Sequence, residues 1–393
     1  MEVGRGGGHG PGGFIVRALG ATLGVVVLST SLLVTAGSAS AQDRPGPLLA
    51  YTGVSAGRVD GLDVVDTGTG RQWRVADGLT HDASWSPDGS RIAWIAYGSG
   101  GGTDDLGRVQ VAAADGSGRT QVDDAGDSRS LAWSPDGTLA WFHRSAWNPT
   151  DCSAADRLRR PDLVLRGVDG TTRTFGTVAP TADGLQFSPD GATVAWRERG
   201  DDVCAAAGTR LVVADVATGR QTVVAGAEDT TGLSFSPDST TLAASRATAD
   251  GGDVVLVDLA TRTARTVVTP EAGETFPVFV GDGTDLAVVR TTPTDRTLSV
   301  VDRSGVPVRD LAEPPEFVEA LVASTDRTSV LVAGRSLPSA DGAVQDTQLW
   351  RQPLDGAAAT ALAGNGRAAV FEAAVSFRSA DAPHLERRQR PRR

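Results

Sequence analysis

Several residue types are scarce in this chain of 393 residues, and each scarcity narrows the classes of protein to which it can belong. Histidine occurs four times, and only His81, His143 and His384 lie beyond the N-terminal segment. So few imidazoles argue against a lyase or hydrolase built on a cluster of metal-binding histidines. Lysine is absent, so all 37 basic residues are arginine, a bias that points to a GC-rich genome rather than to a mechanism.

Long apolar runs are also missing, except for one near the N-terminus. Residues 18–37 are apolar or small throughout, with Arg5 and Arg17 before them and Ala39-Ser40-Ala41 after them. This order is typical of a signal peptide that is cleaved on export. The run of 20 residues is also long enough to span a bilayer, so a retained membrane anchor is the alternative. We therefore predict a signal peptide or anchor over residues 1–41 and a bacterial protein that is secreted or held in the cell envelope.

Only two cysteines are present, Cys152 and Cys204. In an exported protein an even count favours one disulfide bond. Two free buried thiols are the alternative.

Charge is distributed unevenly along the chain. The net charge is −11, yet residues 378–393 carry six arginines against two acidic residues. Residues 1–41 carry a net charge of +1, so the body over residues 42–377 carries about −16, which should repel nucleic acid and anionic lipid. We expect residues 379–393 to form a disordered tail, or to touch an anionic wall polymer or membrane surface.

A four-residue motif recurs at long and similar intervals. Ser86-Pro87-Asp88-Gly89 returns from Ser134, from Ser188 and, with Ser239 in last place, from Ser236. Weaker copies follow around Asp282 and Asp326. Pro presets the second position of a type I turn, Asp bonds the nearby backbone, and Gly accepts positive φ. Such a turn joins two antiparallel strands, and the flanking segments, such as LQF before and TVAWR after, are rich in strand formers.

Two further strands complete each repeat of about 45–55 residues, as RLVVADVATGRQTVVAG illustrates. Four strands per repeat is the pattern of a propeller blade. The region opens with LLAYTG, which matches a second blade strand, and closes with FEAAVSF, which matches a first. We predict an all-β, seven-bladed β-propeller over residues 42–378, with four-stranded antiparallel blades and the C-terminal strand closing the first blade. Trp94, Trp141 and Trp196 share one position in the repeat and should pack between blades.

At this point the segments SWSPDGSRIAW, LAWSPDGTLAW, LQFSPDGATVAW and LSFSPDSTTLAA resemble the WD40-like repeats of the TolB propeller family. The resemblance covers residues 48–378 and implies an exported binding platform. TolB proteins carry a separate α/β domain before the propeller, and we expect that domain to be missing here.

Ligands of propellers bind at the mouth of the central channel, where the inner strands begin. Counting four residues back from the residue that precedes each turn predicts a polar ring there. Its members are His81, Arg129, Asp183, Thr231, Thr275 and Glu319. We interpret this ring as a docking surface for a peptide or protein loop, with Arg129 pairing a carboxylate. A solvated rim is the alternative.

The longest insertion, residues 143–161, carries Trp147, Arg157 and Cys152. An exposed Trp beside Arg is a common binding anchor, so Trp147 and Arg157 form a second candidate site. A loop that folds onto the blade edge and buries Trp147 is equally compatible with the sequence. Because Cys152 and Cys204 fall in corresponding connections of adjacent blades, a disulfide would clip two long loops together.

Two other motifs carry little weight. Gly53-Val54-Ser55-Ala56-Gly57 matches G-x-S-x-G, but a nucleophile elbow needs a strand–turn–helix context that is missing here. Asp-rich turns could hold calcium, although turn chemistry accounts for them without a metal. We therefore predict no cofactor and no metal site.

The sequence favours a monomeric, non-catalytic TolB-like propeller that binds a protein or peptide at one face. An extracellular enzyme that acts on carbohydrates or lactones through carboxylates, with or without calcium, is the alternative. A structural module of a larger envelope assembly is a third possibility.

Overall fold

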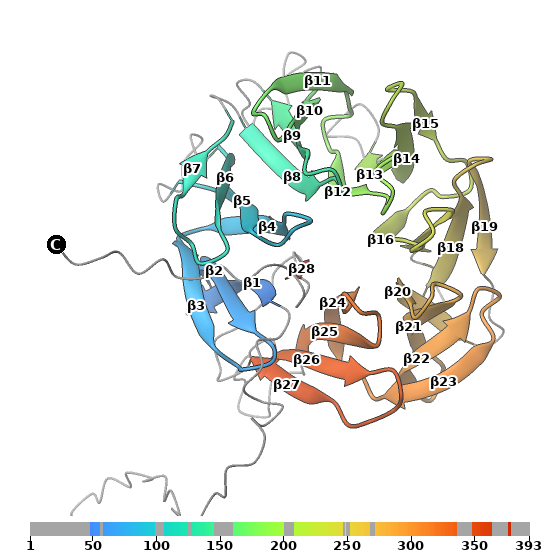
Figure 1. Cartoon of the computed structure of the whole chain (residues 1–393). Coiled ribbons are helices and arrows are strands. Elements are labelled where there is room, and N and C mark those ends of the chain that lie inside the picture. Colours follow the sequence, from blue (N-terminus) through green and yellow to red (C-terminus); the bar gives the residue numbers. More distant parts are fainter. Residues whose placement is uncertain are drawn as a thin grey trace, which may run out of the picture. The chain divides into compact units, whose positions relative to one another are not determined.

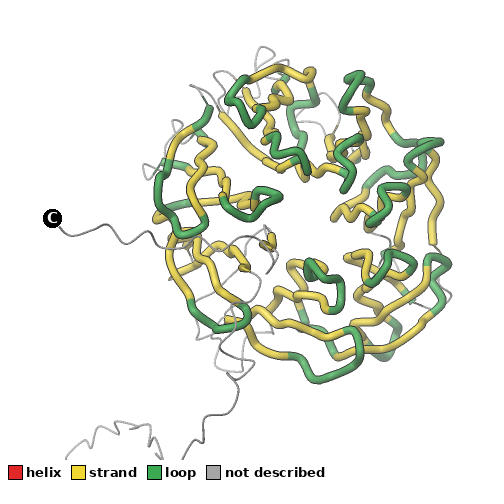
Figure 2. The backbone as a smooth tube through the Cα atoms, viewed as in Figure 1, coloured by secondary structure: helices red, strands yellow, loops and turns green. Residues whose placement is uncertain are grey.

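The computed structural model describes residues 48–55, 58–98, 106–123, 127–144, 160–199, 208–246, 248, 252–267, 272–335, 348–363 and 376–378. The chain separates into two units, Met1–Ser40 and Ala41–Arg393, and every described residue belongs to the second. The regular elements of this part are all strands (Figure 2). The described residues include no helix with the length and apolarity needed to cross a membrane.

Within the described residues, 28 strands form seven sheets of four strands each, arranged as the blades of a propeller (Figure 1). Blade 1 consists, from its inner to its outer strand, of β28 (Ser376–Arg378), β1 (Leu48–Ser55), β2 (Arg58–Asp66) and β3 (Gln72–Asp77). Blade 2 has β4 (Thr80–Trp85), β5 (Arg91–Ala96), β6 (Arg108–Ala113) and β7 (Thr120–Gln121). Blade 3 has β8 (Asp127–Trp133), β9 (Leu139–Arg144), β10 (Asp162–Arg166) and β11 (Thr172–Thr177). Blade 4 has β12 (Asp183–Phe187), β13 (Thr193–Arg199), β14 (Thr209–Asp215) and β15 (Gln221–Val223).

The remaining blades follow the same order. Blade 5 has β16 (Thr230–Phe235), β17 (Thr241–Arg246), β18 (Asp253–Asp258) and β19 (Thr263–Val267). Blade 6 has β20 (Gly273–Val280), β21 (Asp285–Thr291), β22 (Arg296–Asp302) and β23 (Pro307–Ala312). Blade 7 has β24 (Phe317–Ala323), β25 (Ser329–Arg335), β26 (Gln348–Pro353) and β27 (Thr360–Ala363).

Blade 1 is assembled from both ends of the described chain. Strand β28 pairs antiparallel with β1, with Leu49 opposite Phe377. The predicted fold is therefore confirmed, including the C-terminal strand that completes the first blade. Closing the ring in this way covers the edge of β1, which would otherwise offer free backbone groups to another strand.

The recurrent turn depends on its serine more than the sequence suggested. In blade 4, the Ser188 hydroxyl donates to Asp190 Oδ1 at 2.5 Å and accepts from the Thr193 backbone N–H at 2.9 Å. The turns of blades 2, 5 and 7 repeat this pair of bonds. A buried hydroxyl thus ties the aspartate to the backbone where the second blade strand begins, which explains why the motif starts with Ser.

The core lies between the blades. Trp94, Trp141 and Trp196 are between 0 and 2 % exposed, and each packs among apolar side chains of its own blade and the preceding one. Trp196, for example, meets Phe142 of blade 3 edge to face at 6.1 Å between ring centroids. The predicted role of these tryptophans in inter-blade packing is confirmed.

Candidate functional site

Each inner strand of blades 2 to 6 contains a bulge close to the predicted ring. The pairing register shifts there, and one residue takes a positive φ. These residues are Asp82 (52°), Ser130 (49°), Gly184 (67°), Gly232 (56°) and Phe276 (55°). A side chain at such φ values costs about 1 kcal/mol, so the non-glycine members are held in place by their surroundings.

Hydrogen bonds between neighbouring blades hold these bulges. Asp82 Oδ2 accepts from the Ser130 N–H at 3.0 Å, and Ser130 Oγ accepts from the Leu185 N–H at 3.0 Å. The Phe276 N–H donates to Ser245 Oγ at 2.7 Å. Side chains of blades 2, 3 and 5 thus bond the backbone of the inner strand of the next blade, which supports the bulged conformation.

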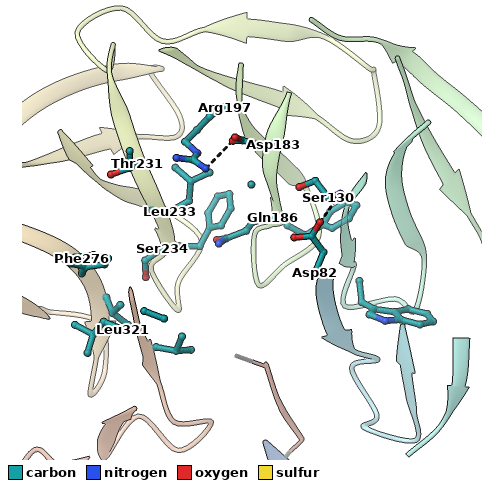
Figure 3. A pocket seen from close by; sticks show the side chains of 18 of the residues that line it. Asp82, Ser130, Asp183, Gln186, Arg197, Thr231, Leu233, Ser234, Phe276 and Leu321 are labelled. Atoms are coloured by element: carbon teal, nitrogen blue, oxygen red, sulfur yellow. Dashed lines mark hydrogen bonds and ion pairs between the residues drawn. The ribbon is translucent and has the colours of Figure 1, made fainter. Parts of the chain in front are cut away.

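A cavity of about 1290 Å³ lies between these strands. It is lined by residues of the inner strands of blades 2 to 7, by two arginines of β13 and by some of the recurrent turns. Figure 3 shows polar and apolar side chains converging on it from several blades, among them Asp82, Asp183, Gln186, Leu233 and Phe276. The volume exceeds that of a typical small-molecule pocket, so the cavity can admit a polymeric segment.

The charged groups of the cavity differ from the ring that the sequence predicted, which was mostly acidic or polar and contained a single arginine. Four arginines line it together with three aspartates. Two of the arginines are paired: Arg129 Nη2 lies 2.6 Å from Asp127 Oδ2, and Arg197 Nη2 lies 2.8 Å from Asp183 Oδ1 (Figure 3). The cavity thus carries slightly more positive than negative charge inside an acidic protein.

The other two arginines, Arg199 and Arg327, have no carboxylate partner within the described residues. Arg199 uses its backbone N–H on Thr181 Oγ1 at 2.7 Å, and its guanidinium makes no hydrogen bond there. Arg327 donates from Nη1 to the Phe279 carbonyl oxygen at 3.3 Å. Burial lowers the pKa of Arg327, as expected for a cation that is partly removed from water without a counter-charge.

Arg327 also stands where blades 2, 3, 4 and 6 have glycine. Its φ is 56°, in the region that Gly89, Gly137 and Gly191 occupy in the equivalent turns. An arginine that keeps this conformation places a guanidinium at the end of the cavity where the inner strands finish. The sequence contained this signal, because Arg replaces Gly in Ser324-Thr325-Asp326-Arg327. Arg197 and Arg199 were missed because the second strand of blade 4 was treated only as a packing strand.

The structure brings four of the six predicted ring residues to the cavity: His81, Arg129, Asp183 and Thr231. His81 meets Tyr97 edge to face at 5.5 Å between ring centroids. Its buried Nδ1 has no hydrogen-bond partner among the described residues.

The other two ring residues lie elsewhere or are described only in part. Thr275 does not line the cavity, and its hydroxyl donates to the Val289 carbonyl oxygen at 3.4 Å. Its neighbour Phe276 lines the cavity instead. Glu319 belongs to β24, where Ala320 and Leu321 line the cavity.

Several other predictions fall outside the described residues. These are the signal peptide, the basic tail, Trp147, Arg157, and the cysteines Cys152 and Cys204. Gly53, Val54 and Ser55 of the G-x-S-x-G match lie on β1, with Ser55 opposite Arg58 of β2. Among the described residues, no group of three or more His, Cys, Asp or Glu side chains is placed to hold a metal ion.

Comparison with known proteins gives structural likenesses only. No protein-family model matches the sequence, and no curated protein matches it. A puromycin-hydrolyzing peptidase from Mycobacterium tuberculosis is 17 % identical, with a TM-score of 0.58 over 82 % of this chain and 54 % of that chain. An oligogalacturonate lyase from Vibrio parahaemolyticus is 14 % identical, with a TM-score of 0.54 over 81 % of this chain and 86 % of that chain.

The similar solved structures also include a TolB, as the repeats predicted. TolB from Acinetobacter baumannii is 16 % identical, with a TM-score of 0.49 over 84 % of this chain and 82 % of that chain. Identities this low show a shared fold, and one fold hosts many unrelated activities. The chain is a seven-bladed β-propeller that is similar in structure to TolB and to the propellers of several enzymes.

Proposed function

We propose that this protein is an exported propeller that binds a protein or peptide segment carrying carboxylates in its central cavity, and that it catalyses no reaction. The observation that supports this most directly is that two cavity arginines, Arg199 and Arg327, have no carboxylate partner among the residues that the structure describes. Arg199 is exposed and Arg327 is half-buried, so both guanidinium groups are accessible to a ligand carboxylate, which each can bind through two hydrogen bonds.

The positions of these arginines favour an extended segment. Arg199 lies beside the end of the cavity where the inner strands begin, and Arg327 follows the end of an inner strand. Inner strands of five or six residues, such as β12 and β16, span about 17–20 Å. An extended peptide covers that length with about five or six residues, so carboxylates at such a spacing could reach both arginines.

The aspartates of the cavity support a binding role over the enzymatic alternative. Asp127 and Asp183 are each held in an ion pair with Arg, and Asp82 accepts a backbone hydrogen bond. A general acid or nucleophile must be free to exchange a proton or attack a substrate. The three carboxylates hold parts of the cavity wall in position. Asp127 or Asp183 could act in catalysis only if its ion pair with arginine were broken.

The test uses a photo-reactive amino acid, because a chain without lysine offers amine-reactive crosslinkers only its N-terminus. Benzoylphenylalanine is placed at the cavity residue Gln186 and, for comparison, at the 57 % exposed Val306 beside the outer strand β23. Each full-length variant is produced in its native envelope and irradiated. We expect a defined adduct from position 186 and none of the same mass from position 306.

The matched variants decide whether the adduct depends on the proposed site. Arg199→Gln combined with Arg327→Gln should abolish it, whereas Arg74→Gln should leave it intact. Arg74 serves as the control because it makes a 2.6 Å ion pair with Asp63 on blade 1, outside the cavity lining. An adduct that survives the double variant, or turnover of a sugar or lactone by the purified protein, would contradict the proposal.

A further inference from the structure

A second cavity, of about 370 Å³, lies between blades 2 and 3, which are neighbours in the ring (Figure 1). From blade 2 it is lined by β6, β7 and the turn between them, and from blade 3 by Trp133, Leu139 and the turn at Gly167–Gly170. It therefore opens on the side of the propeller that carries the recurrent turns. We refer to this cavity as the inter-blade groove.

Two local departures from the repeat account for the groove. The recurrent turn of blade 3 closes from the Ser134 N–H to the Thr138 carbonyl oxygen, over four residues. The equivalent bond of blade 4 runs from Ser188 to Thr193, over five residues. Blade 3 thus lacks one side chain beside Gly137 and Leu139, which line the groove. The outer strand β7 of blade 2 is also only two residues long, so it covers little of the opening.

The groove has an apolar floor and two cationic walls. Val111, Val122, Trp133 and Leu139 supply the floor. Arg91 lies over the Trp133 ring, with its guanidinium carbon 4.9 Å from the ring centroid.

The second wall is Arg166 of blade 3. Within the described part of the chain, the guanidinium groups of Arg91 and Arg166 form no hydrogen bond and no salt bridge. Arg91 interacts electrostatically with Asp88, and Arg166 with Asp169, but each of these carboxylates is hydrogen-bonded within its own turn. Asp88 Oδ1 accepts from Ser86 Oγ at 2.6 Å, and Asp169 Oδ1 accepts from the Thr171 N–H at 2.9 Å.

We propose that the inter-blade groove is a binding site for a small organic carboxylate with an aromatic or branched aliphatic body. The apolar body would lie on the floor, where it removes apolar surface from water. The carboxylate would face Arg91 and Arg166, which can each offer two parallel N–H donors. The volume falls within the range of ordinary small-molecule sites.

Trp133 gives this site a connection to the central cavity, because it lines both. Its indole N–H donates to the Ser84 carbonyl oxygen at 3.2 Å, which fixes the ring between the two cavities. A ligand in the groove therefore touches a side chain that also borders the central cavity. The site itself stands on its own geometry and does not depend on the function proposed above.

The experiment titrates the purified full chain with 3-phenylpropionate and with the uncharged 3-phenylpropanamide, which has almost the same shape. Ligand-observed NMR and calorimetry report binding. We expect saturable binding of the carboxylate with a Kd of about 1 mM, as for a fragment of this size, and about tenfold weaker binding of the amide.

Three variants test the residues. Arg166→Gln should weaken the carboxylate about tenfold and leave the amide unchanged. Val168→Asp, at a rim residue that is 70 % exposed, should weaken it similarly without disturbing the fold. Arg71→Gln is the matched control, because Arg71 lies 5.7 Å over Trp73 in a similar pair that borders neither cavity. Absence of saturable binding, equal affinity for acid and amide, or affinity unchanged in both groove variants would overturn the proposal.

Discussion

Replacing Ser188 by alanine should destabilise the propeller far more than removing a hydroxyl that makes the same bond at the surface. Ser188 is fully buried, and its hydroxyl bonds both Asp190 and the Thr193 N–H. Ser304, in an exposed turn of blade 6, donates to Asp302 Oδ1 at 2.6 Å. The two sites share the donor and the acceptor type and differ in burial, so they form a matched pair.

The magnitude follows from what each variant leaves behind. A hydrogen bond to a charged group contributes about 1.5–3 kcal/mol, and a buried N–H without a partner costs about 1–3 kcal/mol. Ser188→Ala incurs both losses, partly offset by relaxation of the turn, so we expect a decrease of about 3 kcal/mol in the free energy of unfolding. In Ser304→Ala the groups that lose their hydrogen-bond partner can bond to water instead, so the free energy of unfolding should fall by less than about 1 kcal/mol.

The measurement is urea denaturation of both variants followed by tryptophan fluorescence at neutral and acidic pH. The bond from Ser188 is the largest cause that lowers the pKa of Asp190 below the ordinary value of an aspartate. A lowered folded-state pKa stabilises the protein above about pH 4, the unfolded value, and this stabilisation is lost as the pH falls through the folded value. The gap between wild type and Ser188→Ala should therefore narrow below pH 4. Equal effects of the two variants at pH 7 would refute the reasoning.

Three further outcomes are expected. Arg327→Gly should raise the free energy of unfolding by about 1 kcal/mol, because glycine accepts the φ of 56° without strain. The same variant should weaken crosslinking through the central cavity. If stability and crosslinking both rise or both fall, the role given to Arg327 is contradicted. Trp196→Ala should lower the free energy of unfolding by about 3–5 kcal/mol in denaturant titrations, because it opens a cavity between blades 3 and 4. A chain that ends at Ala363 lacks β28 and should lower the urea midpoint and form higher oligomers in size-exclusion chromatography, since the edge of β1 is then unpaired. A monomer of unchanged stability would show that ring closure through β28 is dispensable.

The sequence was sufficient for the architecture because a propeller repeats one local solution. Each Ser-Pro-Asp-Gly turn fixes a hairpin, and the tryptophans mark one buried position in successive blades. The unmatched strand at each end of the region predicted closure, since only pairing of β28 with β1 completes a blade. Local chemistry and periodicity are properties of short segments, and they can be read without knowing what lies across the ring.

The candidate site in the central cavity depends on contacts between segments that are far apart in the sequence, and no short segment predicts such contacts. The sequence placed His81, Arg129, Asp183 and Thr231 at the cavity, but Arg129 turned out to be paired with Asp127. Arg199 on a second strand and Arg327 in a glycine position meet at the cavity because six blades converge there, and neither has a carboxylate partner in the described part of the chain. The same is true of the inter-blade groove, where one missing residue near Gly137 and a short β7 leave space beside Trp133.

The sequence by itself determined the repeating hairpins, the blade count and the closure, because these follow from local turns and strand patterns. Only the tertiary structure decided which charges remain unpaired and where cavities form, because both depend on contacts between blades.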